Sequence, residues 1–129
     1  MEQEQPKLIS SQKTGGRDLE PLRGKRTLCI GIDIGSTSSD LVVLDDENRV
    51  VLSDYRRTKG KPVETFRTQL RDIFAKINPA NVETIAATGS AARLPAKILV
   101  IPFINEVAAQ AAAITHLYPD IQNATVIEM

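Results

Sequence analysis

A short polar turn between two apolar runs carries the residues that could bind a phosphate group. Gly35 ends the first run and is followed by Ser36, Thr37 and Ser38. Because glycine has no Cβ, a ligand can approach its backbone, and the amides and hydroxyls that follow can donate hydrogen bonds to phosphate oxygens. Asp33 lies just before the turn, where its carboxylate could hold Mg²⁺, which keeps several waters and needs one or two carboxylates. The pattern predicts a phosphate and magnesium site.

Two better-known phosphate-binding loops do not fit this turn. The sequence has no G-x-x-x-x-G-K-[ST] motif, and the spacing of Gly31 and Gly35 differs from G-x-G-x-x-G. Both of those motifs open a helix, whereas the segment after Gly35 has the β-branched composition of a strand. A plain Ser/Gly hairpin turn remains an alternative, since such turns are common in β-rich domains. Small polar residues over 35–39, however, exceed what a two-residue turn requires.

The elements that position the turn follow from hydrophobic periodicity. Alternation over 27–34, an apolar run over 41–44 and a third run over 49–55 predict three strands joined by hairpins. Apolar positions over 63–77 recur at helical spacing, with Pro62 in the first turn and Asn78 at the end. We therefore expect a β-β-β-α beginning.

The second half of the chain predicts alternating strands and helices. A strand is expected over 83–87, then an irregular stretch containing the apolar segment 98–101, then an alanine-rich helix over 105–117 and a last strand from 124. The full order, β-β-β-α-β-α-β, predicts an α/β fold with a mixed five-stranded sheet and helices packed against it. Residues 1–25 are highly charged and lack any period, so we expect a flexible N-terminal tail.

Composition limits the classes of function. The chain has 129 residues, enough for one modest domain, with 42% hydrophobic and 25% charged residues, as in a soluble globular protein. Sixteen Lys and Arg balance sixteen Asp and Glu, so we expect neither a nucleic-acid nor a membrane partner. No apolar run approaches the ~20 residues of a membrane span, and no signal peptide is evident, so a cytoplasmic location is expected. The single cysteine, Cys29, excludes an intrachain disulfide and favours a reducing compartment.

Several motifs resemble a known superfamily of ATPases. Residues 30–44 are similar to the first phosphate-binding hairpin of the superfamily that includes actin, heat-shock chaperones and sugar kinases. Within it, they most resemble the activators of 2-hydroxyacyl-CoA dehydratases and the related benzoyl-CoA reductase ATPase subunits, with their G-I-D-x-G-S-T hairpin. Thr88 to Ser90, Asn105 with Glu106, and Val126 to Met129 resemble further motifs of that family. The resemblance implies a ribonuclease-H-like, actin-like ATPase subdomain. Residues 26–129 would form an N-terminal lobe that lacks the second phosphate loop and second lobe.

The resemblance also implies roles for single residues. Asp33 would help hold Mg²⁺, and Glu128 stands where the family usually has an aspartate near the metal. Gly35–Ser38 and Gly89 would contact the nucleotide phosphates. Glu106 matches a catalytic carboxylate that orients water near the γ-phosphate, the kind of positioning that phosphoryl transfer needs.

From the residues alone, Asn105 and Glu106 are better explained as the cap of the alanine-rich helix. One departure from the family is Asp40, where the family commonly has lysine. The surrounding residues also resemble the N-terminal hairpin of hydantoinase and oxoprolinase subunits. A hydantoinase-type ATPase or a sugar or acyl kinase therefore stays open, as does a non-catalytic, chaperone-like interaction module.

For the complete protein, the resemblance implies an activase that binds ATP and ADP with Mg²⁺. Its ATP hydrolysis would drive electron transfer to a CoA-ester dehydratase or reductase. The family also implies a homodimer with a [4Fe-4S] cluster between subunits, whose cysteine ligands are not in this chain. We expect these 129 residues alone to bind nucleotide weakly and to turn it over negligibly.

Overall fold

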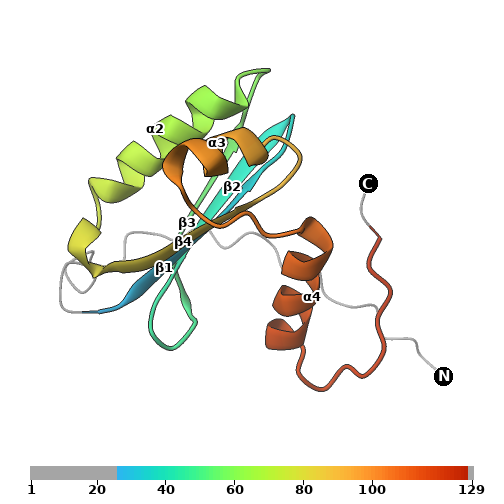
Figure 1. Ribbon diagram of the computed structural model, residues 1–129. Coiled ribbons are helices and arrows are strands. Elements are labelled where there is room, and N and C mark those ends of the chain that lie inside the picture. Colours follow the sequence, from blue (N-terminus) through green and yellow to red (C-terminus); the bar gives the residue numbers. More distant parts are fainter. Residues whose placement is uncertain (1–25, 128–129) are drawn as a thin grey trace.

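A four-stranded mixed sheet forms the centre of the molecule (Figure 1). The computed structural model describes residues 26–127, so the expected N-terminal tail and Glu128 lie outside the described residues. β1 (Leu28–Ile34), β2 (Ser38–Leu44) and β3 (Val50–Arg57) are antiparallel neighbours, and β4 (Val82–Thr88) lies parallel to β1. The sheet order is β3-β2-β1-β4. The hairpins predicted from the sequence are therefore present.

The alternation along the strands divides the sheet into a buried face and an open face. On the buried face the apolar side chains of β1 and β2 have at most 3% of their surface exposed. Its members in these two strands are Leu28, Ile30, Ile32, Ile34, Leu41 and Val43. The intervening residues of β1 and β2 are only partly buried or are exposed. Both helices that cover the buried face, α2 and α3, lie on the same side of the sheet (Figure 1).

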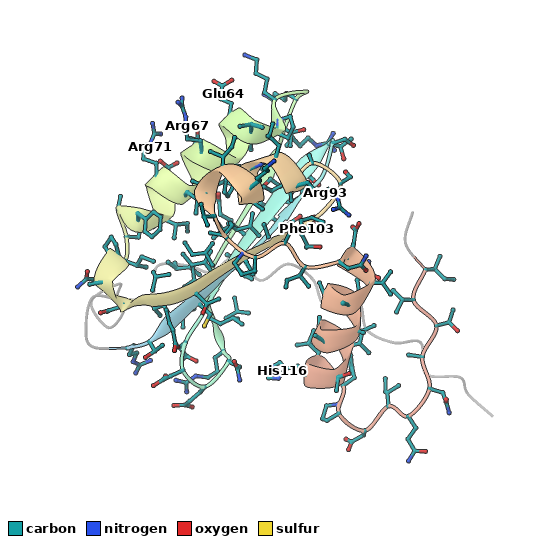
Figure 2. The ribbon with its side chains drawn as sticks, viewed as in Figure 1. Glu64, Arg67, Arg71, Arg93, Phe103 and His116 are labelled. Atoms are coloured by element: carbon teal, nitrogen blue, oxygen red, sulfur yellow. The ribbon has the colours of Figure 1, made fainter. Side chains whose placement is uncertain are left out.

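Helix α2 (Pro62–Phe74) packs one apolar side on the sheet and turns a charged side to the solvent. Pro62 occupies its first turn, where a missing backbone N–H costs nothing. Phe66 and Ile73 are buried, whereas Arg67 and Arg71 project outward (Figure 2). The regular helix ends before the expected residue 77. A 3₁₀ turn, η1 (Pro79–Asn81), follows it and leads into β4.

A buried polar contact fixes α2 against the hairpin. The Ser39 hydroxyl donates to Gln69 Oε1 at 2.6 Å. Gln69 Nε2 donates to the backbone oxygens of Ser39 and Asp54, at 3.1 Å each. Ser39 and Gln69 are fully buried, so these bonds satisfy polar groups that water cannot reach. They link α2 to β2 and β3 in one defined position.

The expected fifth strand is wrong. Residues 124–127 adopt no regular structure and lie beyond α4, away from the sheet (Figure 1). The position beside β4 is instead taken by the residues around Phe103, which forms an isolated parallel bridge with Ala87. Ala87 N donates to Pro102 O at 2.9 Å, and Ile104 N donates to Ala87 O at 2.8 Å. These residues pair with β4 through a single bridge and form no strand of their own, so the sheet has four strands among the described residues.

The stretch expected to be irregular contains a helix, α3 (Arg93–Leu99). Pro95 lies in its first turn, where proline is tolerated. Val100 ends the helix in a left-handed conformation, with φ 55°. Its amide contacts Lys97 O and the Ile101 amide donates to Ala96 O, the bonding pattern that usually places glycine at this position. The observed order is therefore β-β-β-α-β-α-α apart from the 3₁₀ turn.

Helix α4 (Glu106–Leu117) confirms the alanine-rich helix. Asn105 caps it, because its Oδ1 accepts from Val107 N at 3.0 Å. None of its residues is buried, and the helix stands apart from the sheet (Figure 1). In the described part of the chain, no helix has the length and apolar character needed to cross a membrane.

Candidate functional site

The carboxyl ends of three parallel segments meet at one end of the sheet. β1 and β4 are parallel and place Asp33 opposite Thr88. The Phe103 segment is parallel to β4 and ends at the same side, because Phe103 lies opposite Ala87. The turns after all three segments therefore leave the sheet at one end. In open α/β sheets this end is where ligands bind.

The turn that was predicted to bind phosphate joins β1 to β2 at this end. Gly35 N donates to Ser38 O at 2.9 Å and closes it, while Ser36 and Thr37 are exposed at its tip. In the described part of the chain, the amides of Ser36 and Thr37 have no hydrogen-bond acceptor. They remain able to donate to a ligand.

Thr58, just after β3, holds this turn from the other side. Its amide donates to Thr37 O at 2.9 Å and its hydroxyl donates to Ser36 O at 2.5 Å. Thr58 is 2% exposed, so both bonds are shielded from water. The carbonyls of Ser36 and Thr37 are therefore engaged by Thr58, and only their N–H groups stay unengaged.

Gly89 lies against the end of β1 more closely than any other residue type could. Its φ is +99°, and a Cβ there would collide with Asp33 Oδ1 and lie 2.5 Å and 2.7 Å from Ile34 O and N. Ala91 N donates to Ile34 O at 2.8 Å and fixes the turn after β4 to β1. The close approach brings the Gly89 backbone next to the Asp33 carboxylate. The glycine of the Thr88 to Ser90 motif is therefore also the residue that lies against the end of β1.

Three oxygen-bearing side chains share the open face at this end. Asp33 lies opposite Asp40 on β2 and opposite Thr88 on β4, and directly opposed residues place their side chains on one face. Although Asp40 is exposed as a residue, partial burial of its carboxyl and then the negative charge of Asp33 raise its pKa above the ordinary value. The Thr88 hydroxyl is buried and has no hydrogen-bond partner within residues 26–127.

These groups fit a magnesium ion. Mg²⁺ binds through one or two carboxylates and keeps several waters, so Asp33 with Asp40 is a sufficient donor set. Two neighbouring carboxylates repel each other, and a bound cation would relieve that repulsion. No group of three or more His, Cys, Asp or Glu suited to a metal occurs among the described residues.

Glu106, predicted to be catalytic, begins α4 at the same end of the sheet. It follows Ile104 by two residues, and Ile104 comes directly after the residue paired with Ala87. Glu106 is partly buried. The helix-cap interpretation is correct for Asn105, whose side chain bonds Val107 N. That cap leaves the Glu106 carboxylate in the first turn, where the helix dipole favours a negative charge.

The chain does not fit an iron–sulfur cluster. Such a cluster needs four ligands, usually cysteine thiolates, and the sequence has only Cys29. Cys29 lies near the start of β1, four residues before Asp33 and toward the opposite end of that strand. It therefore takes no part in the candidate site.

Arg93 is the first residue of α3, four residues after Gly89. Its guanidinium carbon lies 4.5 Å from the centre of the Phe103 ring, a cation–π contact that Figure 2 shows between α3 and the segment before α4. The contact ties the turn after β4 to the Phe103 segment. Two of the three turns at this end are thus linked by their side chains.

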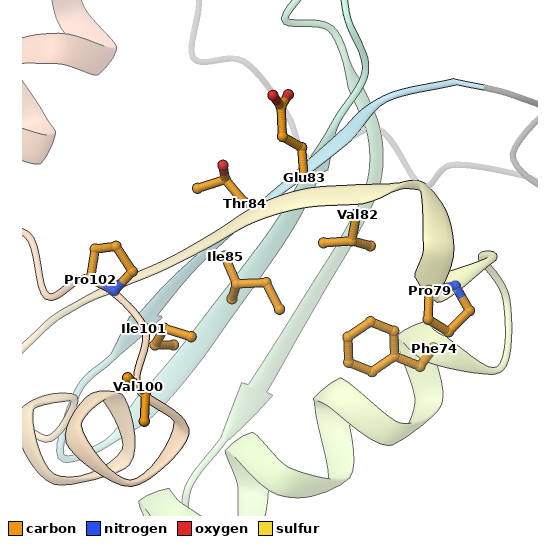
Figure 3. Close-up of a pocket in the computed structure, with 9 residues that line it drawn as sticks. All are labelled: Phe74, Pro79, Val82, Glu83, Thr84, Ile85, Val100, Ile101 and Pro102. Carbon is orange, nitrogen blue, oxygen red and sulfur yellow. The ribbon is translucent and has the colours of Figure 1, made fainter.

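A groove of about 490 Å³ lies along the amino-terminal half of β4 (Figure 3). Apolar side chains line most of it, including those of Phe74, Ile85 and Val100. None of the predicted site residues borders it, and its one titratable side chain is that of Glu83. The groove is therefore mainly apolar and lies apart from the turn after Gly35.

Solved structures of low sequence identity share this fold, and they include components of two CoA-ester dehydratase systems. Component A of the (R)-2-hydroxyglutaryl-CoA dehydratase of Acidaminococcus fermentans superposes with a TM-score of 0.64 at 18% identity, over 74% of this chain and 37% of that one. The activator of the 2-hydroxyisocaproyl-CoA dehydratase of Clostridium difficile, with bound ADPNP, gives 0.53 at 22%, over 73% and 35%. A Pseudomonas aeruginosa protein with similarity to the peptidase YEAZ gives 0.52 at 16%, over 72% and 50%. No family model and no curated protein matches the sequence.

Two contributors to this end of the sheet were not found from the sequence. Thr58 lies more than twenty residues from the turn that it holds. Arg57 lies opposite Ser38 because of the β2–β3 register, which shifts between Val43 and Leu44. From the sequence, Arg57 belongs to a basic stretch with Arg56, Lys59 and Lys61, which is better explained as a solvated loop than as an anion site. No local signal indicates the long-range pairing of Arg57 or Thr58.

Proposed function

We propose that the end of the sheet around Asp33 and the turn after Gly35 binds the phosphates of a magnesium nucleotide. The observation that carries the proposal is the contact between Gly89 and the end of β1, which leaves no room for a Cβ beside Asp33. Next to this contact, the Ser36 and Thr37 amides have no acceptor within the described residues. Backbone amides without acceptors beside a tight glycine are a common way to bind phosphate.

Each predicted residue has a role in this proposal. The amides around Ser36, Thr37 and Ser38 bind phosphate oxygens, and Gly35, whose amide closes the turn on Ser38 O, leaves room for them at the backbone. Asp33, with Asp40 opposite, holds Mg²⁺, which neutralises phosphate charge when it is bound. The bare backbone of Gly89 forms the opposite wall of the site.

Glu106 is proposed to orient the water that attacks the terminal phosphate. Its place at the first turn of α4, beyond the bridge with β4, puts its backbone at the same end of the sheet as Asp33. A carboxylate that holds a water in line needs correct placement more than a shifted pKa. The proposed role thus relies on the short Phe103 segment for positioning.

For the complete protein we propose an ATPase that activates a CoA-ester dehydratase or reductase. The two dehydratase components among the structural neighbours support this partner class, and the ADPNP in one of them supports a nucleotide. This chain covers only 37% and 35% of those two proteins. It would supply one lobe of the nucleotide site, so we expect weak binding and negligible turnover from the 129 residues.

Paramagnetic relaxation tests the binding site. We expect Mn²⁺ with ATP, added to the ¹⁵N-labelled chain, to broaden the amide signals of Ser36, Thr37 and Gly89. Signals of Glu83 and Val100 in the β4 groove should stay sharp. The Asp33→Asn variant should lose the selective broadening, whereas Glu83→Gln should keep it. Broadening centred on the groove, or equal broadening with and without ATP, would contradict the proposal.

A small-molecule kinase or a hydantoinase-type ATPase is the second candidate. Asp40 favours it, because an acidic side chain stands where the activators commonly have lysine. The fold does not distinguish between these candidate functions, because the Pseudomonas aeruginosa protein with similarity to the peptidase YEAZ shares it. ADP formation by the complete protein that depends on a small substrate would select this candidate, and dependence on a reducible partner protein would select the activator.

A further inference from the structure

Arg57 is an exposed cation at the edge of the candidate phosphate site. It lies opposite Ser38 in the β2–β3 ladder, and directly opposed residues share a face. Ser38 and Asp40 are two residues apart on β2 and also share that face, as do Asp40 and Asp33. Arg57 is thus on the open face with Asp33, beside the last residue of the turn.

The neighbouring arginine has a different environment. Arg56 lies on the buried side of β3, where its Nε is 2.7 Å from Asp54 Oδ2 and its Nη2 donates to Asp72 Oδ2 at 2.9 Å. Arg57 makes no ion pair within the described residues and is exposed. Arg56 therefore holds β3 against α2, whereas the side chain of Arg57 is available to a ligand.

The backbone of Arg57 is fixed relative to the turn. The next residue, Thr58, is buried and bonds the carbonyls of both Ser36 and Thr37. Lys59 and Gly60 then form a tight turn with positive φ, closed by Lys61 N donating to Thr58 O at 2.8 Å. Any movement of the phosphate-binding turn therefore carries Arg57 with it.

A cationic side chain at the site would offset the negative charges of Asp33 and Asp40. Asp33 and Asp40 face each other there, and together they would repel a polyphosphate unless metal and protein cations compensate. The nearest cationic side chain by strand register is that of Arg57, next to Ser38.

We propose that Arg57 is the phosphate-binding cation of this site and selects for a polyphosphate chain, with Thr58 as the residue that positions it. The proposal rests on the nucleotide function proposed above. A planar guanidinium can donate two parallel hydrogen bonds to phosphate oxygens, which a lysine cannot do. Arg57 therefore contributes directional binding as well as charge.

The test is the affinity of the ¹⁵N-labelled 129-residue chain for Mg·ATP, measured from the shifts of the Ser36 and Thr37 amides. Arg57→Gln should weaken binding about tenfold, the loss of a charge-assisted contact. Lys59→Gln removes the same charge two residues further along, after the end of β3, and should change affinity by less than about twofold, as expected for an exposed charge outside the β2–β3 ladder. Arg57→Lys should recover only part of the loss. Adenosine, which has no phosphates, should bind equally to all variants.

Each outcome separates the two proposals. Unchanged affinity in Arg57→Gln, with normal binding by the wild type, would overturn the role of Arg57 alone. Equal losses in Arg57→Gln and Lys59→Gln would also overturn it, because general attraction would then explain the effect. No binding of Mg·ATP by the wild type at millimolar concentration would overturn the nucleotide function itself. The amide spectrum of each variant reports directly whether its fold is intact.

Discussion

Gly89 is the residue whose identity the geometry constrains most. A methyl group there meets the Asp33 carboxylate and the backbone of Ile34, in a conformation that L-residues rarely adopt. We predict that Gly89→Ala lowers the free energy of unfolding by roughly 3 kcal/mol or more, from overlap and strain together. Urea unfolding followed by circular dichroism measures the change.

Gly60 is the matched control for that substitution. It has a similar positive φ of +77°, but a Cβ there would have nothing within 4 Å. Gly60→Ala should therefore cost only about 1 kcal/mol, the strain of a left-handed residue. Equal losses at Gly89 and Gly60 would show that backbone strain, and not the close approach to Asp33, explains the glycine.

Asp40 should make the fold less stable as it ionises. Because its pKa is raised in the folded state, folding favours its protonated form, and this contribution is complete below the unfolded pKa of about 3.8. It is lost as the pH rises through the raised folded pKa. We predict that Asp40→Asn gains stability relative to wild type as the pH rises from about 3 to 7. Unfolding midpoints across this range test the sign.

Asp45 should change the pH dependence of stability in the opposite direction to Asp40. Hydrogen bonds from the Arg49 side chain and backbone, and from the Glu47 amide, lower its pKa. Its contribution is therefore present above the unfolded pKa and is lost as the pH falls through the lowered folded pKa. Asp45→Asn should be less stable than wild type at pH 7, with the difference shrinking in acid. Parallel pH profiles for the two variants would contradict both assignments.

At the scale of elements, Gln69 decides how α2 sits on the hairpin. Gln69→Leu keeps the volume but removes the acceptor of the Ser39 hydroxyl and the side-chain donor to the carbonyls of Ser39 and Asp54. Because these groups are buried or partly buried, we predict a loss of roughly 2–4 kcal/mol in the free energy of unfolding. Thermal and urea unfolding both measure it.

Arg67→Ala, on the outer side of the same helix, is the control (Figure 2). An exposed substitution there should change stability by less than about 0.5 kcal/mol. If Gln69→Leu were equally mild, the polar contact between α2 and the hairpin would not define the packing of the helix.

Most elements could be predicted because their signals are local. The alternation in β1 and the apolar spacing in α2 each describe a segment's own burial, so three hairpin strands and two of the helices follow from the sequence. Pro95 concealed α3, because proline suggests a helix break except in the first turn, where it actually lies. The bridge beside β4 was not predicted, because nothing local in residues 102–104 indicates pairing with Ala87.

The candidate site divides in the same way. Residue type and spacing indicate Asp33 and the turn after Gly35, whereas Gly89 was indicated only by the resemblance to a known family. Thr58 and Arg57 reach the turn only through the β2–β3 register, whose shift cannot be derived from hydrophobic pattern alone. Contacts across strands therefore need the structure.

At the scale of the whole molecule, this chain covers 37% of one dehydratase component and 35% of another, and it presents one end of a sheet to solvent. Helix α4 has no buried residue, and Val107 on it is 73% exposed. If the described residues form one lobe of a larger nucleotide site, as proposed, Ser36, Thr37 and Asp33 would hold a nucleotide from one side only. The same arrangement explains why we expect binding without appreciable turnover.

A crystal structure of the chain grown with Mg²⁺ and a non-hydrolysable ATP analogue tests the central claim most directly. We predict phosphate oxygens within hydrogen-bond distance of the Ser36 and Thr37 amides, with the metal on the Asp33 side. A nucleotide seated in the β4 groove, or one whose phosphates turn away from the β1–β2 turn, would contradict it.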